Sequence, residues 1–227
     1  MEYYYKTLAS AFILGKYDKH LPINISNRLF SVLGEEEKEY LIEYGRKNES
    51  DFYIFKRSII RPRVQHVLSY MHSLHFQNLL DIGSGRGSFL FPFMEQFPFI
   101  EVTSVDLQPE KCDVFNYINT GGYSGLKCLT QDATKLSFND NAFDVVTALE
   151  VLEHIPNAKL AFKEIIRVAK SQVIISVPSK EDDNPEHIHL LTKNIFIQWI
   201  TEISSLKYKF KEVKGHLIII VKKQINA

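Results

Sequence analysis

The sequence predicts an α/β protein built on a mostly parallel sheet, and three observations support this fold class. From residue 76 onward, short apolar runs alternate with segments of helical composition. The first run leads directly into a loop with glycines at alternate positions. The next two runs each carry an aspartate at or just after their end. Strands that alternate with helices form right-handed βαβ units, and ligands bind beyond the carboxyl ends of such strands.

Composition and charge fit one globular domain with an extension. Of 227 residues, 45% are hydrophobic and 24% are charged, which excludes disordered, collagen-like and coiled-coil proteins. Basic and acidic side chains number 27 each, so a dedicated nucleic-acid-binding protein is not favoured. The apolar stretches are too short to span a membrane, so we expect no membrane partner.

The cysteine count and the first residues predict where the protein works. Cys112 and Cys128 are too few for a disulfide framework or a thiolate zinc site. The start, MEYYYKTLAS, lacks the basic segment, apolar stretch and cleavage site of a signal peptide. Together these observations predict a cytoplasmic protein with reduced cysteines. We expect it to be a monomer or a homodimer.

Residues 1–75 are predicted to form a helical extension that folds over the carboxyl ends of the strands as a lid. Glu35–Lys47 is rich in helix formers, and 51–75 carries apolar residues at helical spacing, with Pro62 expected to kink or restart the helix. The densest basic cluster, which is either solvated surface or a contact for an anionic substrate, consists of Lys56, Arg57, Arg61 and Arg63. The aromatic residues that either pack in the core or line a substrate pocket are Tyr3, Tyr4, Tyr5, Tyr53 and Phe55.

Residues 76–227 are predicted to form the ligand-binding domain with seven strands. The expected strands are Asn78–Ile82, 101–107, Leu126–Thr130, Phe143–Leu149, 172–177, Lys207–Val213 and 217–221. The expected helices are 86–96, one that begins at Pro109, Ala158–Val168, and one that follows Thr192 and ends near Ile203. Gly215 joins the last two strands as an antiparallel pair.

A glycine loop follows the first strand and precedes a helix. Gly83, Gly85 and Gly87 stand at alternate positions, with Ser84 between the first two and Asp81 two residues before the first. Glycines allow positive φ angles and let a ligand lie against the backbone, where the first helical turn offers unpaired N–H groups. A dinucleotide fingerprint would need its third glycine at position 88, which is serine, so a nicotinamide oxidoreductase is disfavoured.

The D-x-G-x-G-x-G pattern resembles that of the class I S-adenosylmethionine-dependent methyltransferases. The string Glu-Val-Leu-Glu-His at 150–154 resembles the branch that methylates quinones and other small metabolites, whereas the turn at 169–172 departs from the family's usual Lys-Pro-Gly-Gly. The resemblance covers about residues 76–227 and implies a Rossmann-like sheet of seven strands, mostly parallel, in the order 3-2-1-4-5-7-6. It also implies S-adenosylmethionine as cofactor, wrapped by the glycine loop, with Asp81 near its amino group.

Two aspartates extend the expected cofactor site. Asp106, which follows Gly83 by 23 residues, offers a bidentate acceptor for two ribose hydroxyls, or else caps the next helix. The resemblance implies that Asp132 accepts a hydrogen bond from the adenine amino group and that the backbone N–H of Ala133 contacts the ring; Asp132 could instead hold a turn. The remaining expected cofactor contacts are Leu107 and Leu149.

The segment after the fourth strand carries the candidates for the chemistry. His154 is the first candidate for a general base, with Glu150 beside it, because histidine is the commonest group in that role. His187 and His189, beyond the fifth strand, are candidates for substrate binding. Alternatively, Glu150, Glu153, His154 and a later histidine could hold a divalent cation, as in the small-RNA methyltransferases that this segment resembles.

The sequence therefore predicts a methyltransferase that uses S-adenosylmethionine, needs no metal and acts on the oxygen, nitrogen or carbon of a small molecule. Two alternatives stay open. One is a metal-assisted RNA methyltransferase that would use Glu150, Glu153, His154 and His189. The other is a cofactor-binding domain without catalysis. The neutral charge balance and the lack of an evident RNA-binding domain disfavour the RNA alternative.

Overall fold

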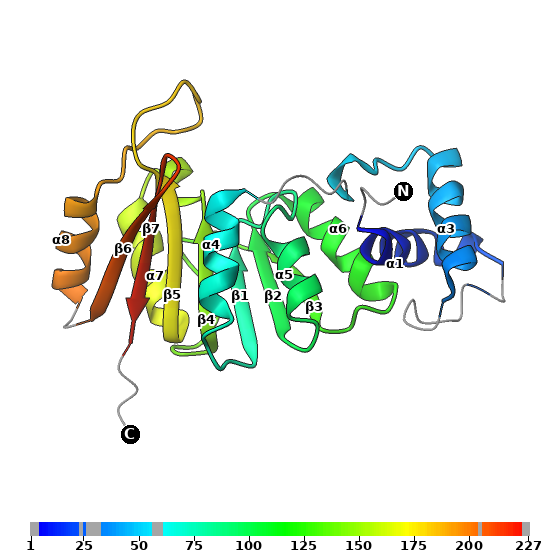
Figure 1. Ribbon diagram of the computed structural model, residues 1–227, viewed down its shortest axis with the longest axis horizontal. Coiled ribbons are helices and arrows are strands. Elements are labelled where there is room, and N and C mark those ends of the chain that lie inside the picture. The colour runs from blue at the N-terminus through cyan, green and yellow to red at the C-terminus, as the bar shows by residue number, and fades with distance from the viewer. Residues whose placement is uncertain (1–4, 23–24, 26–32, 56–60, 204–205, 224–227) are drawn as a thin grey trace.

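The computed structural model describes residues 5–22, 25, 33–55, 61–203 and 206–223. These residues include one seven-stranded sheet with helices packed around it (Figure 1). The strand order is β3-β2-β1-β4-β5-β7-β6, as the family resemblance implied. Only β7 runs against its neighbours, so the carboxyl ends of the other six strands share one edge of the sheet. The strands are β1 (Asn78–Ile82), β2 (Glu101–Asp106), β3 (Leu126–Thr130), β4 (Phe143–Leu149), β5 (Ala169–Pro178), β6 (Lys207–Val213) and β7 (His216–Lys222).

Helices cover both faces of the sheet and extend beyond the β3 edge (Figure 1). The α-helices are α1 (Lys6–Tyr17), α3 (Glu35–Lys47), α4 (Pro62–Met71), α5 (Leu90–Gln96), α6 (Pro109–Thr120), α7 (Ala158–Val168) and α8 (Lys193–Ile203). The 3-10 helices are η1 (Asp18–His20), η3 (Tyr53–Phe55) and η4 (Leu152–His154). Pro62 begins α4, where its missing N–H would have no intrahelical partner in any case. None of the described helices is long and apolar enough to cross a membrane.

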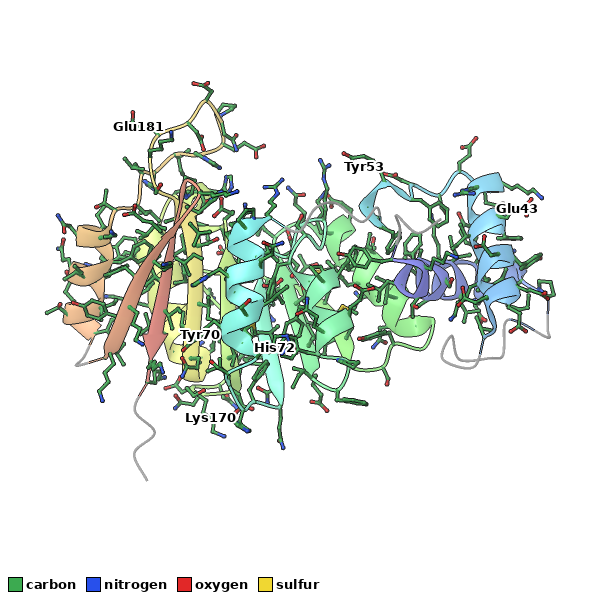
Figure 2. All side chains as sticks on the ribbon, viewed as in Figure 1. Glu43, Tyr53, Tyr70, His72, Lys170 and Glu181 are labelled. Atoms are coloured by element: carbon green, nitrogen blue, oxygen red, sulfur yellow. A yellow bond between two sulfur atoms is a disulfide. The ribbon has the colours of Figure 1, made fainter. Side chains whose placement is uncertain are left out.

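Alternating side chains divide the core into two layers. Leu79 and Val145 point to the face covered by α4, α5 and α6, whereas their neighbours Leu80 and Val146 point to the face covered by α7 and α8. Successive strand residues point to opposite faces, so strands buried on both sides read as continuous apolar runs. Figure 2 labels Tyr70 on α4, whose hydroxyl donates to Gln172 Oε1 of β5 at 2.9 Å. This bond ties α4 to the middle of the sheet.

The N-terminal helices continue the first of these core layers. Helix α1 packs against α6, and α3 packs against α1, so both lie beside the β3 edge of the sheet (Figure 1). At Gly121 an added Cβ would overlap the backbone carbonyl of Ala11, which shows how closely α1 and the end of α6 approach. The packing therefore crosses the predicted boundary at residue 75. The parts of the expected lid that border the carboxyl-end cavities are Tyr5, η3 and residues 61–63.

Within residues 76–227, the starts of two elements differ from the prediction by three residues or more, and the other strand ends differ by at most one residue. Helix α5 begins at Leu90 instead of residue 86, because Gly87 has a φ of +76°, which a right-handed helix does not contain. Strand β5 begins at Ala169 instead of residue 172. No glycine turn follows α7, and Ala169 pairs at once with Phe143 of β4.

The expectation of two reduced cysteines is wrong for this structure. Cys112 on α6 and Cys128 on β3 form a disulfide, with their Cα atoms 4.9 Å apart. Both residues are buried in the layer between α6 and the sheet. The pairing depends on how α6 packs on β3, and a separation of 16 residues along the chain gives no sign of it.

Candidate active site

Two neighbouring cavities open at the carboxyl ends of the strands. The first, here the strand-end cavity, has a volume of about 760 Å³; among its lining residues are Gly83, Gly85, Asp106, Leu107, Asp132 and Ala133. The second, here the arginine cavity, has a volume of about 950 Å³; among its lining residues are Tyr5, Tyr53, Arg61, Arg63, Arg86, His187 and His216. Glu150, His154 and Glu186 line both cavities and therefore form the wall between them.

The glycine loop contributes lining residues to both cavities. Gly83, Gly85 and Gly87 all have positive φ angles, of +68°, +53° and +76°. At Gly83 a Cβ would lie 2.6 Å from Cγ2 of Val151, so a larger residue would clash as well as strain the backbone. Gly83 and Gly85 line the strand-end cavity, whereas Gly87 lines the arginine cavity. A smaller adjoining cavity of about 140 Å³ is lined by Asp81, Ser84 and Leu149 together with Arg63.

Asp81 is a buried carboxylate whose hydrogen bonds come from two side-chain hydroxyl groups. Ser84 Oγ donates to its Oδ2 at 2.5 Å, and Thr147 Oγ1 donates to its Oδ1 at 2.6 Å. Burial raises the pKa of Asp81 to about 6, although both hydrogen bonds act in the opposite direction. The carboxylate would therefore be stabilised by a cation that entered the small cavity beside it.

Asp106 and Asp132 both line the strand-end cavity, and each also holds the local backbone. Asp106 Oδ2 accepts from Gly85 N at 3.2 Å and Oδ1 accepts from Gln108 N at 3.0 Å, so this side chain ties the glycine loop to the end of β2. Asp132 Oδ1 accepts from both the N–H and the hydroxyl of Thr134 at 2.8 Å. The turn role considered for Asp132 is thus present, in a residue that also faces the cavity.

Glu150 lies where β4 ends, in a conformation that few non-glycine residues adopt. Its φ is +60°, held by a hydrogen bond from its N–H to Ser176 O at 2.8 Å. Its Oε2 lies 2.9 Å from His216 Nδ1, and its Oε1 lies 3.7 Å from Arg63 Nε. Such strained residues cluster at functional sites, where surrounding contacts hold them in place. Glu150 here links the end of β4 to α4 and to the start of β7.

The side chain of His187 contacts that of His154 on the arginine-cavity side of the wall, whereas His189 lies away from both cavities. The rings of His154 and His187 have centroids 4.8 Å apart. His154 Nδ1 lies 2.9 Å from the carbonyl oxygen of Glu186, which can only accept, so Nδ1 carries the proton and Nε2 is the basic nitrogen. His189 instead donates from Nε2 to the carbonyl oxygens of Ile155 and Pro156, at 3.0 and 3.2 Å, and lines neither cavity.

Glu153, the other carboxylate of the segment after β4, is fully buried beneath this wall. Neither of its side-chain oxygens has a hydrogen-bond partner among the described residues. Burial raises its pKa to about 8, and the nearby charge of Glu150 acts in the same direction. The structure therefore separates the two glutamates of the alternative metal set: Glu150 faces Arg63 and His216, and Glu153 faces the histidines.

The arginine cavity contains residues whose roles the sequence did not assign. Arg63 is only 7% exposed and bridges Glu150 and His216, with Nη1 3.5 Å from His216 Nε2. Burial lowers the pKa of Arg63, and it also lowers that of His216. The basic cluster in the sequence pointed to Arg61 and Arg63, but nothing marked Arg86 or His216. Lys56 and Arg57, the other members of the cluster, lie outside the described residues.

Of the aromatic residues proposed for a substrate pocket, some line a cavity and one is buried in the core. Tyr5 and Tyr53 line the arginine cavity, whereas Phe55 is fully buried and stacks on Phe91 with ring centroids 5.4 Å apart. Tyr3 and Tyr4 lie outside the described residues. Figure 2 shows Tyr53 and Glu181 at the same edge of the sheet, opposite Lys170, so the N-terminal segment and the loop after β5 approach the site from two sides.

The strand order, the glycine loop and the acids beyond β2 and β3 define the class of this protein. It has the class I fold of the S-adenosylmethionine-dependent methyltransferases. Residues 80–177 match the family model described as a methyltransferase domain. The match runs from β1 into β5, and it includes the glycine loop and the wall residues Glu150 and His154, but not Glu186.

Curated relatives are methyltransferases of small molecules. The chain is 29% identical over 164 residues to the sterol 24-C-methyltransferase erg6 of Aspergillus fumigatus, which covers 65% of this chain and 42% of that protein. It is 27% identical over 128 residues to the 2-methyl-6-phytyl-1,4-hydroquinone methyltransferase of a Synechocystis species, covering 56% of this chain and 40% of that protein. The chain thus spans less than half the length of these two relatives.

Solved structures share the fold at low identity. A methyltransferase from Aquifex aeolicus has a TM-score of 0.58 at 19% identity, covering 72% of this chain and 90% of that chain. The PH0226 protein of Pyrococcus horikoshii has a TM-score of 0.59 at 19% identity, covering 80% and 99%. The [4+2]-cyclase SpnF has a TM-score of 0.60 at 15% identity, covering 73% and 81%. One fold thus carries more than one reaction, and the site must decide the function.

Proposed function

We propose that this protein transfers the methyl group of S-adenosylmethionine to a small acceptor molecule that carries an anionic group. The observation that supports this proposal best is the pair of neighbouring cavities that share Glu150, His154 and Glu186 as lining residues. One cavity suits the cofactor and the other suits the acceptor. The relatives that act on sterols, a hydroquinone and alkaloids agree with a small acceptor.

The strand-end cavity fits the cofactor in size and in chemistry. Its volume of about 760 Å³ lies within the usual range for ligand pockets, about 300–1,000 Å³. In this proposal Asp106 accepts hydrogen bonds from the ribose hydroxyls, and Asp132 and the Ala133 N–H contact the adenine. The cofactor's ammonium group supplies a positive charge beside Asp81, and its carboxylate lies near Arg63, which lines the same small cavity.

The arginine cavity suits an anionic acceptor with an apolar or aromatic body. Tyr5, Tyr53 and Phe91 supply the apolar surface. Arg61 and Arg86 also line the cavity, and no carboxylate among the described residues lies within ion-pair distance of either one. Arginine presents a planar set of donors that matches carboxylates and phosphates. An acceptor with such a group would be held with its remaining atoms toward the wall.

The chain's own contribution to the chemistry is alignment and proton removal. S-adenosylmethionine supplies a methyl group on a positively charged sulfur, which is an electrophile without further activation. The two cavities align the acceptor with that methyl group, and such alignment can lower the barrier by several kcal/mol. His154 Nε2 is the basic nitrogen at the wall, so we assign it the proton that an oxygen or nitrogen acceptor loses.

The cofactor part of the proposal is tested by calorimetric titration. The protein is titrated with S-adenosylmethionine, S-adenosylhomocysteine and NAD, each with and without EDTA. We expect micromolar binding of both sulfur compounds and none of NAD; binding of NAD alone, or of nothing, would overturn the proposal. For the acceptor half, aromatic acids are screened beside their methyl esters, with methylated product detected by mass spectrometry. Methylation of the acids in preference to their esters is expected, and equal rates for both would refute the anionic acceptor.

A further inference from the structure

A row of polar side chains crosses the buried middle of the sheet and includes Asp81. Asp81 of β1 pairs with Ser104 of β2 and with Thr147 of β4, and Ser104 pairs in turn with Cys128 of β3. All four residues are buried. Residues that pair directly on adjacent strands point to the same face of a sheet, so these side chains lie in one line. The row connects the disulfide of Cys128 with the carboxylate that is expected near the cofactor.

The hydroxyl groups beside Asp81 donate in a fixed direction. Ser84 Oγ donates its one hydrogen to Asp81 Oδ2, so it accepts from Ser104 Oγ, which lies 2.6 Å away. Ser104 thereby uses its own hydrogen, and its oxygen is left to accept from the next group of the row. That group is Cys128 Sγ, 3.5 Å from Ser104 Oγ. A chain of donors directed at Asp81 is therefore complete only when this sulfur carries a hydrogen.

The oxidation state of the two cysteines decides whether the sulfur carries that hydrogen. In the disulfide, Cys128 Sγ is bonded to Cys112 Sγ and has no hydrogen to donate. A dithiol reductant breaks the S–S bond by supplying two electrons and two protons, and it becomes a disulfide itself. Cys112 and Cys128 are then thiols, and the thiol of Cys128 can donate to Ser104 Oγ.

We propose that the disulfide between Cys112 and Cys128 is a redox switch for the carboxylate of Asp81. Ser104 and Ser84 are positioning residues that transmit the change. Each donor in a hydrogen-bonded chain polarises the next, so a thiol at the start of the chain strengthens the bond that the carboxylate accepts. The charged form of Asp81 is therefore more stable in the reduced protein. The consequence for cofactor affinity rests on the proposed function, whereas the change at the carboxylate does not.

The direction of the effect follows from the surroundings of Asp81. Burial raises the pKa of this carboxyl to about 6 in the disulfide form, and the charge of Asp106 acts in the same direction. Arg63 and Arg86 line the small cavity beside it. Reduction changes none of these charges, so the added thiol donor should lower the pKa of Asp81, by about 0.5. Because an ammonium group binds the charged carboxylate, cofactor affinity should rise on reduction below pH 6 and be the same in both forms at pH 8.

Two single variants separate the thiol from the mere loss of the disulfide. Cys112→Ala leaves Cys128 as a permanent thiol, whereas Cys128→Ala removes the sulfur from the row, and neither variant can form the disulfide. The pKa of Asp81 is measured on the full chain by carbon NMR titration, and Asp81→Asn identifies its signal. We expect a pKa about 0.5 lower in Cys112→Ala than in Cys128→Ala or the oxidised wild type. Reduction of the wild type with dithiothreitol should lower the pKa by the same amount.

A third variant and a binding measurement complete the test. Ser104→Ala interrupts the row and leaves both cysteines in place, so reduction should not change the pKa of Asp81 in this protein. The calorimetric Kd of S-adenosylmethionine should be about twofold lower in Cys112→Ala than in Cys128→Ala at pH 5.5, and equal at pH 8.

Three results would overturn the switch. One is the same pKa in Cys112→Ala and Cys128→Ala, and another is a full response to reduction in Ser104→Ala. The third is a difference in Kd that is as large at pH 8 as at pH 5.5. The expected pKa changes in a protein that binds no S-adenosylmethionine would support the switch and refute the proposed cofactor site, so either proposal can fail alone.

Discussion

The two cavities of this site are built in different ways. The strand-end cavity takes its expected cofactor contacts from the ends of β1, β2 and β3 and the residues that follow them, within short stretches of sequence. The arginine cavity gathers Tyr5, η3, α4, the loop after β5 and the β6–β7 turn, so its lining residues range from position 5 to position 216. One side of the site is local in sequence and the other is assembled by tertiary packing.

The carboxylates near the two cavities also differ in where their partners come from. Asp81, which lines the small cavity beside the glycine loop, is stabilised by the hydroxyls of Ser84 and Thr147, and no cation contributes among the described residues. Glu150 of the arginine side has His216 and Arg63 as partners, brought together from three segments. The small cavity beside Asp81 therefore has room for a positive ligand group. The arginine cavity is lined by three arginines and three carboxylates, and neither Arg61 nor Arg86 has a carboxylate within ion-pair distance among the described residues.

The largest effect is expected at the wall between the cavities. Changing His154 to alanine removes the basic nitrogen that faces the acceptor, and loss of a general base lowers rates by about 10²–10⁴-fold. Affinity for S-adenosylmethionine should change less than threefold. Turnover at saturating cofactor and the calorimetric Kd measure the two quantities. His189→Ala is the control. A rate that stays within threefold of the wild type would remove His154 from the chemistry.

The second effect tests the isolated carboxylate of the strand-end side. The pKa of Asp81 is about 6 in the folded protein against an ordinary 3.8, so between these values the folded state binds a proton that the unfolded state does not. Stability should therefore fall as pH rises from about 4 to about 6.5, by about 2–3 kcal/mol relative to Asp81→Asn. Urea unfolding of both proteins across this range measures the difference. A difference independent of pH would show that Asp81 is already charged at pH 4.

The third effect concerns the ribose acceptor. Asp106→Ala should weaken S-adenosylmethionine binding by about 1–3 kcal/mol, or about 5- to 150-fold, because it removes a charged acceptor and frees the N–H of Gly85. The KM of the acceptor substrate should change little. Lys170→Ala, at the opposite edge of the sheet, serves as the control in the same titration (Figure 2). Equal affinity of Asp106→Ala and wild type would place the ribose elsewhere.

The same contrast explains what the sequence could predict. The strand positions follow from periodicity, and the glycine loop and the two aspartates are short motifs. The strand order was implied by the family resemblance, and the structure confirms it. The role of Arg63 and the position of His216 depend on how α4 and the β6–β7 turn pack against β4, which no local pattern records. The disulfide between Cys112 and Cys128 was missed for that reason too.

The alternative metal set shows that residues close in sequence need not face the same site. Glu150, Glu153 and His154 are close in sequence and were considered as one set, yet the positive φ of Glu150 turns the chain between β4 and η4. Glu150 then faces His216 at the start of β7, and Glu153 faces His187. The choice between His187 and His189 depended on loop geometry, which the structure supplies through the carbonyl contacts of His189.

The smallest effect is expected at the rim of the arginine cavity. Arg61 is exposed, so its attraction for an anionic acceptor is screened by solvent and should contribute about 0.5–1 kcal/mol. Arg61→Ala should then raise the acceptor KM about two- to fivefold with kcat unchanged, and added salt should reduce the difference between variant and wild type. Lys170→Ala removes the same charge far from the site and should leave KM unaltered. Because the cofactor is expected in the other cavity, its Kd should be the same in both variants; a parallel loss of cofactor affinity in Arg61→Ala would mean that the two cavities act as one site.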